Sequence, residues 1–146
     1  MFRLSRAAEY SIRGVLYLAG KSDKVNTDIE EIATATDVPA SYLAKLFQTL
    51  AKKGFVRSVR GPEGGFVLLK TPEEIKVLDI IEAVEGPIFL NECMIRDGQC
   101  PRDNVCPIHD VWKEAQSVFL GYLRGCDFKQ LAIAGRKKKK QAAGAP

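Results

Sequence analysis

Histidine is scarce in this chain of 146 residues, which has only one, His109. Histidine is the commonest general acid or base, so a single histidine disfavours acid–base catalysis as the function. In addition, no nucleophile, base and orienting group occur together in the sequence. We therefore do not expect an enzyme. Cysteine is also rare, with four residues, yet three of them lie close to His109.

Long apolar runs are absent as well. The longest, Val15–Ala19, is far too short to span a bilayer, and charged residues at positions 3, 6, 9 and 13 interrupt the segment where an export signal would lie. We therefore expect a cytoplasmic protein with no membrane contact. In a reducing cytosol, clustered cysteines are more often metal ligands or redox-active thiols than structural disulfides.

Acidic residues are missing from two segments. Between Pro39 and Arg60 the chain has five basic residues and no acid, and the last twelve residues likewise have five basic residues and no acid. Residues 71–134 have the opposite balance, with 6 basic and 11 acidic side chains. A basic surface without acids attracts phosphate. The same charge pattern also occurs on an ordinary solvated face, so charge alone does not distinguish the two interpretations.

The periodicity of the first 54 residues predicts three helices. Residues 4–18 form an amphipathic pattern, and Thr27 with Glu30 matches a capping box that begins a second, short helix. After a turn at residues 36–38, Pro39 begins a third helix and Gly54 suits its C-terminal cap. Two helices joined by a short turn indicate a helix-turn-helix.

The third helix has two different faces. Its apolar residues are spaced at i, i+3, i+4 and i+7, namely Leu43, Leu46, Phe47 and Leu50. The remaining positions are mostly small, polar or basic, namely Ser41, Tyr42, Ala44, Lys45, Gln48 and Lys52. Such a face suits a DNA major groove, where side chains near the helix N-terminus meet base edges.

A β-hairpin is predicted directly after this helix. Two β-rich runs, residues 55–60 and 66–70, flank the turn sequence "GPEGG". A hairpin that follows a helix-turn-helix is a wing. Arg57 and Arg60 lie on the strand that enters the tip, from which arginine can reach a narrow minor groove or a phosphate.

These segments resemble the winged-helix regulators typified by IscR, with relatives such as NsrR, RirA and the cysteine-metabolism repressor. The resemblance rests on "RLSRAAEYSIRGVLYLA", "SYLAKLFQTLAKKGFVRSVRGPEGGF" and "VLDIIEAVEGP", and it extends to the cysteine loop. It implies an α+β, mainly α fold and a homodimer that binds double-stranded, palindromic operators. It also implies, for many members, an iron–sulfur cluster that senses redox state, iron or nitric oxide.

The cysteine loop has the spacing Cys93-x6-Cys100-x5-Cys106-x2-His109. By the resemblance, these are three cysteine ligands and a histidine ligand of a 2Fe-2S or 4Fe-4S cluster, although the first spacing is one residue longer than in the type member. Thiolates suit iron bridged by sulfide. Glu9 is the alternative fourth ligand, because some relatives supply a carboxylate from the first helix across the dimer.

Other interpretations of the loop stay open. A zinc site would accept the same donors, although its commoner C-x2-C pairs are missing. The cysteines would otherwise act as a metal-free thiol switch in a protein that docks on a partner enzyme, as the cysteine-metabolism relatives imply. Cys126 stands apart from the loop and is expected to be a small buried apolar residue.

The C-terminal third predicts a long helix over residues 108–124 with a wide apolar face. Because one small domain does not need such a face, we expect a twofold dimer through the helix around Trp112, Phe119 and Tyr122. Asp127 and Gln130 then cap a short final helix. The predicted organisation is a DNA-binding domain (1–86), a cysteine loop (87–108), dimerisation and final helices (109–134) and a disordered basic tail (135–146).

Overall fold

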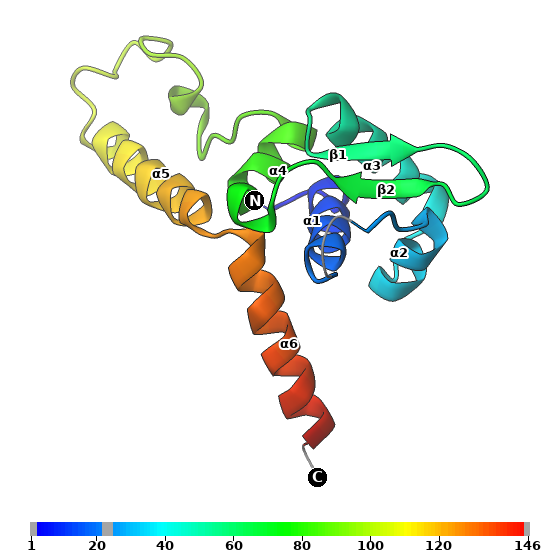
Figure 1. The fold of residues 1–146 in the computed structure, drawn as a ribbon. Coiled ribbons are helices and arrows are strands. Elements are labelled where there is room, and N and C mark those ends of the chain that lie inside the picture. The colour runs from blue at the N-terminus through cyan, green and yellow to red at the C-terminus, as the bar shows by residue number, and fades with distance from the viewer. Residues whose placement is uncertain (1–2, 22–24, 145–146) are drawn as a thin grey trace.

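A computed structural model describes residues 3–21 and 25–144 of the chain. A compact N-terminal body carries a two-stranded hairpin on one side, while two C-terminal helices extend from the other (Figure 1). Along the chain the elements are α1 (Arg6–Ala19), α2 (Ile29–Thr36), α3 (Ala40–Lys52), β1 (Val56–Val59), β2 (Gly65–Leu68), the 3-10 turn η1 (Pro72–Glu74), α4 (Val77–Glu85), the 3-10 turn η2 (Glu92–Met94), α5 (Pro107–Gly125) and α6 (Phe128–Gly144).

The helix-turn-helix consists of α2 and α3, joined by the predicted turn. Asp37 ends α2 in the left-handed conformation (φ 55°, ψ 48°), and Pro39 is the N-cap of α3. The capping box predicted at Thr27 is wrong. The N-cap of α2 is Asp28, with no side-chain capping bond, because the backbone of Thr27 pairs instead with Phe66 in an isolated β-bridge.

The wing is an antiparallel pair of four-residue strands, each shorter than the sequence predicted. The register places Arg57 opposite Val67 and Ser58 opposite Phe66. The bridge to Thr27 adds a third backbone segment to this sheet. The wing is therefore hydrogen-bonded to the residues that precede α2.

One apolar core holds the helix-turn-helix and the wing together. Phe47 of α3 is fully buried and meets Phe66 of β2 edge to face, with ring centroids 5.2 Å apart. Phe128, the first residue of α6, is fully buried in the same core. A second cluster is formed by Ala8, Leu78, Ile81 and Ile88, with Phe119, Leu120 and Leu123 of α5 packed against it.

The junction of α5 and α6 is attached to the start of α4. Lys76 and Asp127 form a β-bridge, and the amide of Val77 donates to the carbonyl of Cys126 at 2.9 Å. Asp127 caps α6 by accepting from the amide of Gln130 at 2.9 Å, as predicted. Cys126 itself is half-buried rather than buried, because its thiol points along α5 and donates to the carbonyl of Tyr122 at 3.3 Å.

The predicted disordered tail is wrong, because α6 continues without interruption to Gly144. The segment lacks apolar periodicity, but its alanine, lysine and glutamine residues have high helix propensity. In residues 3–21 and 25–144, the structure contains no helix with the length and apolar character needed to cross a membrane.

Candidate nucleic-acid interface and cysteine loop

The exposed face of α3 carries the residues that the sequence predicted for base contacts. Ser41, Tyr42, Lys45 and Gln48 are all exposed. The apolar residues predicted to face inward are buried, and Leu43, Phe47 and Leu50 are completely so. The core therefore fixes which side of α3 is presented to a ligand.

Tyr42 is held in place by a residue that the sequence analysis missed. The ring of Tyr10 on α1 meets it edge to face at 5.7 Å between centroids, and the guanidinium of Arg13 lies 5.5 Å from the centroid of the Tyr10 ring. Aromatic pairs of this kind stabilise by about 0.5–1.5 kcal/mol beyond their buried area. No local spacing signals the contact, because it joins two helices that are distant in the sequence.

The wing carries Arg57 and Arg60, and both side chains are exposed. Its tip is attached to the helix-turn-helix through Asn26, whose side-chain amide donates to the carbonyl of Glu63. Beside this contact a hollow of about 670 Å³ lies between the wing and the start of α2. The segment before α2 thus holds the wing tip in place relative to α2.

The surface formed by α3 and the wing is electropositive. It bears Lys45, Arg57 and Arg60, and no acid occurs from residue 39 to residue 62. The ion pairs found among the described residues join Arg13 to Glu9, Lys21 to Glu31 and Lys129 to Glu73, so none of them neutralises this surface. Such a surface can bind phosphate.

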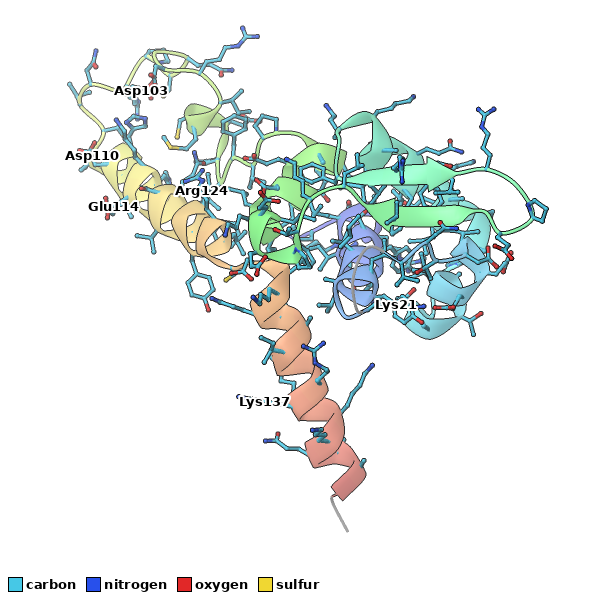
Figure 2. The ribbon with its side chains drawn as sticks, in the orientation of Figure 1. Lys21, Asp103, Asp110, Glu114, Arg124 and Lys137 are labelled. Atoms are coloured by element: carbon cyan, nitrogen blue, oxygen red, sulfur yellow. The ribbon has the colours of Figure 1, made fainter. Side chains whose placement is uncertain are left out.

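Both ends of the cysteine loop are attached to α5: the start by a hydrogen bond, and the end because the chain continues into the helix. The amide of Leu90 donates to the side-chain oxygen of Gln116 at 3.0 Å, and Cys106 is the N-cap of α5. Between these points Gly98 adopts a φ of 76°, and its amide donates to Asp103 at 3.1 Å. Figure 2 shows Asp103 on the outer part of this loop and Asp110 at the adjoining end of α5.

The predicted ligands lie in two groups. Cys93 and Cys100 line one hollow of about 380 Å³, while Cys106 and His109 line another of about 520 Å³. All the cysteines are free thiols, and Nε2 of His109 is buried without a hydrogen-bond partner. In the described part of the chain, no three histidine, cysteine or acidic side chains come close enough together to hold a metal ion.

Three thiols and an imidazole are donors that suit a thiolate-ligated iron–sulfur cluster. The loop holds them too far apart in this structure to enclose one. A buried imidazole nitrogen with no partner is an uncompensated polar group, and a metal ion would satisfy it. Glu9, the alternative ligand, is exposed on α1 and forms an ion pair with Arg13 at 2.7 Å.

The predicted dimer face of α5 is only partly used within the chain. Phe119 packs against the second cluster with α4, whereas Tyr122 keeps 75% of its surface exposed and Trp112 keeps 36%. Val111 and Val118 extend the exposed apolar surface along the same helix. No residue of α5 is buried.

The comparisons with known proteins identify the family of this fold. Residues 4–134 match the model of the Rrf2 family, described as iron-dependent transcriptional regulators. The chain belongs to the Rrf2 family. This match spans α1 to the first part of α6 and includes the whole cysteine loop.

Similar proteins of the Rrf2 type carry regulator names. The chain is 31% identical over 142 residues to the HTH-type transcriptional regulator IscR of Photorhabdus laumondii, covering 92% of this chain and 86% of that one. The structure of CymR, the global cysteine regulator of B. subtilis, shares 30% identity with a TM-score of 0.68, covering 92% and 98% of the two chains. The structure of T. potens IscR matches with a TM-score of 0.70 at 24% identity, which shows the fold alone.

The winged-helix fold and the family resemblance predicted from the sequence are confirmed. The chain is a transcriptional regulator of the Rrf2 family, and the regulator names of its relatives agree with the expectation that it is not an enzyme. DNA binding is implied by this membership.

Proposed function

We propose that the protein is a homodimeric DNA-binding regulator whose cysteine loop holds an iron–sulfur cluster. The observation that carries the DNA-binding part is the exposed, acid-free face of α3 beside a wing that is hydrogen-bonded to the residues that precede α2. In this arrangement Ser41, Lys45 and Gln48 enter the major groove, while Arg57 and Arg60 contact phosphate or the minor groove.

The homodimer is supported by the exposed apolar surface of α5. Val111, Trp112, Val118 and Tyr122 are exposed together on one helix, while Phe119 borders this surface from the α4 side. A second copy of the same helix would bury this surface through an isologous contact, the commonest form of oligomer. Two recognition helices related by a twofold axis would then read half-sites about one helical turn, or a multiple of it, apart.

The cluster is supported by the donors of the cysteine loop. Cys93, Cys100 and Cys106 would hold it as thiolates, and the unpartnered Nε2 of His109 would be the fourth donor. When bound, such a cluster supplies a redox-active and iron-dependent group. The chain's own contribution is to orient the donors, through the hydrogen bond between Leu90 and Gln116 and the start of α5 at Cys106.

A second candidate is a regulator that uses its cysteines as thiols without a cluster and docks on a partner enzyme. It is favoured by one observation: in the described part of the chain the predicted ligands do not converge on a metal position. Anaerobic purification with a visible-light spectrum and analysis of iron and sulfide separates the two candidates, because only a cluster absorbs in the visible range.

The DNA-binding part is tested by selecting bound sequences from a random duplex pool and then measuring affinities. Lys45→Ala should relax sequence preference, since a good base contact contributes about 1–3 kcal/mol of discrimination. Arg60→Ala should weaken binding to all sequences about equally. Lys113→Ala, which removes an exposed cation from α5, is the matched control. If Lys45→Ala and Arg60→Ala both bind every sequence as the wild type does, the proposed docking is wrong.

A further inference from the structure

The second half of α6 is a basic helix that extends away from the rest of the molecule (Figure 1). Its five consecutive cations, Arg136–Lys140, are all exposed, and we call them the basic arm. The side chain of Lys137 points away from the domain body (Figure 2). From Arg136 to Gly144 the helix extends over about 12 Å at 1.5 Å per residue.

The basic arm has charge that the protein does not neutralise. Lys129, at the other end of α6, is paired with Glu73, which raises the pKa of the lysine and lowers that of the glutamate. The arm has no comparable acid on its own helix, because Phe128–Gly144 contains none. Arg136 also faces like charges three and four residues ahead, an arrangement that destabilises a helix. An anionic partner would remove this repulsion.

The distribution of the cations selects the class of anion. Successive helical residues are rotated by about 100°, so the four lysines point to all sides of the helix. A helix that docks on a protein presents one face, and lysine is depleted in protein interfaces. A helix that lies on a membrane needs an apolar face, which residues 136–140 lack. A polyanion with a diffuse field, in contrast, needs no single face.

We propose that the basic arm binds the phosphodiester backbone of DNA, outside the base pairs that α3 reads. This inference rests on the DNA-binding function proposed above. Lysine binds phosphate as a compact point charge with no bidentate geometry. The arm therefore increases affinity for any duplex and leaves sequence preference to α3 and the wing.

The test is the salt dependence of binding to a DNA duplex of random sequence. A variant with all five cations of the arm replaced by glutamine (R136Q, K137Q, K138Q, K139Q, K140Q) keeps residues that favour a helix. Each lost phosphate contact reduces the slope of log K against log salt by about 0.9, so we expect a slope shallower by about 2–4. A reduction of less than about 0.9 would mean that fewer than one contact is lost, and would overturn the proposal.

Two further variants separate the arm from charge in general. Changing the four lysines to arginine keeps the charge and should keep the wild-type slope. Lys113→Gln combined with Arg124→Gln removes two exposed cations from α5 and should change the slope less than the arm variant does. An RNA duplex is measured in parallel, and a larger arm-dependent loss on RNA than on DNA would overturn the assignment to DNA.

Failure of this inference is distinguishable from failure of the proposed function. On a selected operator, the arm variant should keep the wild-type ratio of specific to nonspecific affinity, and a changed ratio would mean that the arm reads sequence. If the wild type shows no sequence preference at all, the proposed reading of bases by α3 fails, while the slope on random duplex still decides the role of the arm.

Discussion

Replacing Gly65 by alanine should detach the wing from the helix-turn-helix. A Cβ atom at this position would lie 2.1 Å from the carbonyl oxygen of Thr27 and 2.9 Å from the amide nitrogen of Asp28. Both are backbone atoms, so no side-chain rotation relieves the overlap. The strand must move away from Thr27, which breaks the two hydrogen bonds between Thr27 and Phe66, now 2.9 and 2.8 Å long.

The magnitude follows from these contacts. Each backbone hydrogen bond contributes about 0.5–1.5 kcal/mol net, so the loss of both lowers the free energy of unfolding by about 1–3 kcal/mol. Urea denaturation measures this change. Gly135→Ala is the matched control, because a Cβ there meets no atom within 4 Å and alanine in a helix should stabilise by about 0.5–1 kcal/mol.

The same substitution should weaken DNA binding in the folded protein, because Arg60 moves with the hairpin while α3 stays in the core. Affinity for a selected duplex is measured at a temperature where both proteins are folded. A Gly65→Ala protein with the urea midpoint and the DNA affinity of the wild type would refute the role of this contact in placing the wing.

Three other predictions concern packing, assembly and the cysteine loop. Gly14→Ala should lower the free energy of unfolding by about 1–2 kcal/mol in urea, because its Cβ would lie 2.6 Å from the buried ring of Phe47, which outweighs the better helix propensity; a more stable protein would contradict this. Tyr122→Glu should convert the proposed dimer to a monomer in sedimentation at micromolar concentration, and a monomeric wild type would contradict the proposed dimer itself. Anaerobically purified His109→Ala should lose the visible cluster spectrum while Glu9→Ala keeps it; the opposite result would assign the fourth ligand to Glu9.

Local patterns in the sequence were sufficient to predict which side of α3 is buried and which is exposed. Its apolar residues repeat with the helical period, so the buried side containing Leu43 and Phe47 follows from the sequence, and with it the exposed side containing Lys45. The turn at Asp37 could also be predicted, because an aspartate tolerates the left-handed conformation that joins α2 to α3.

Contacts between distant segments could not be predicted in this way. Thr27 matched a capping box locally, but its backbone is used by Phe66, which lies 39 residues later. Gly65 was interpreted as a turn residue. In the structure this position must be glycine because the backbone of Thr27 comes so close that a side chain would not fit. In α6 the error had another cause, since the absence of an apolar pattern does not prevent lysine-rich and alanine-rich sequence from being helical.

The cysteine loop and α3 are joined by a continuous series of contacts, although they lie in different parts of the molecule. Gln116 holds the start of the loop on α5, and the carbonyl of Cys126 at the end of α5 accepts from the first residue of α4. Phe128 follows immediately and is buried in the core that contains Phe47 of α3. A movement of α5 must therefore either break the hydrogen bond at Cys126 or carry α4 with it. Because packed cores do not deform continuously, a movement of α4 changes the packing that supports α3. This gives the loop a physical route to the proposed DNA-binding face.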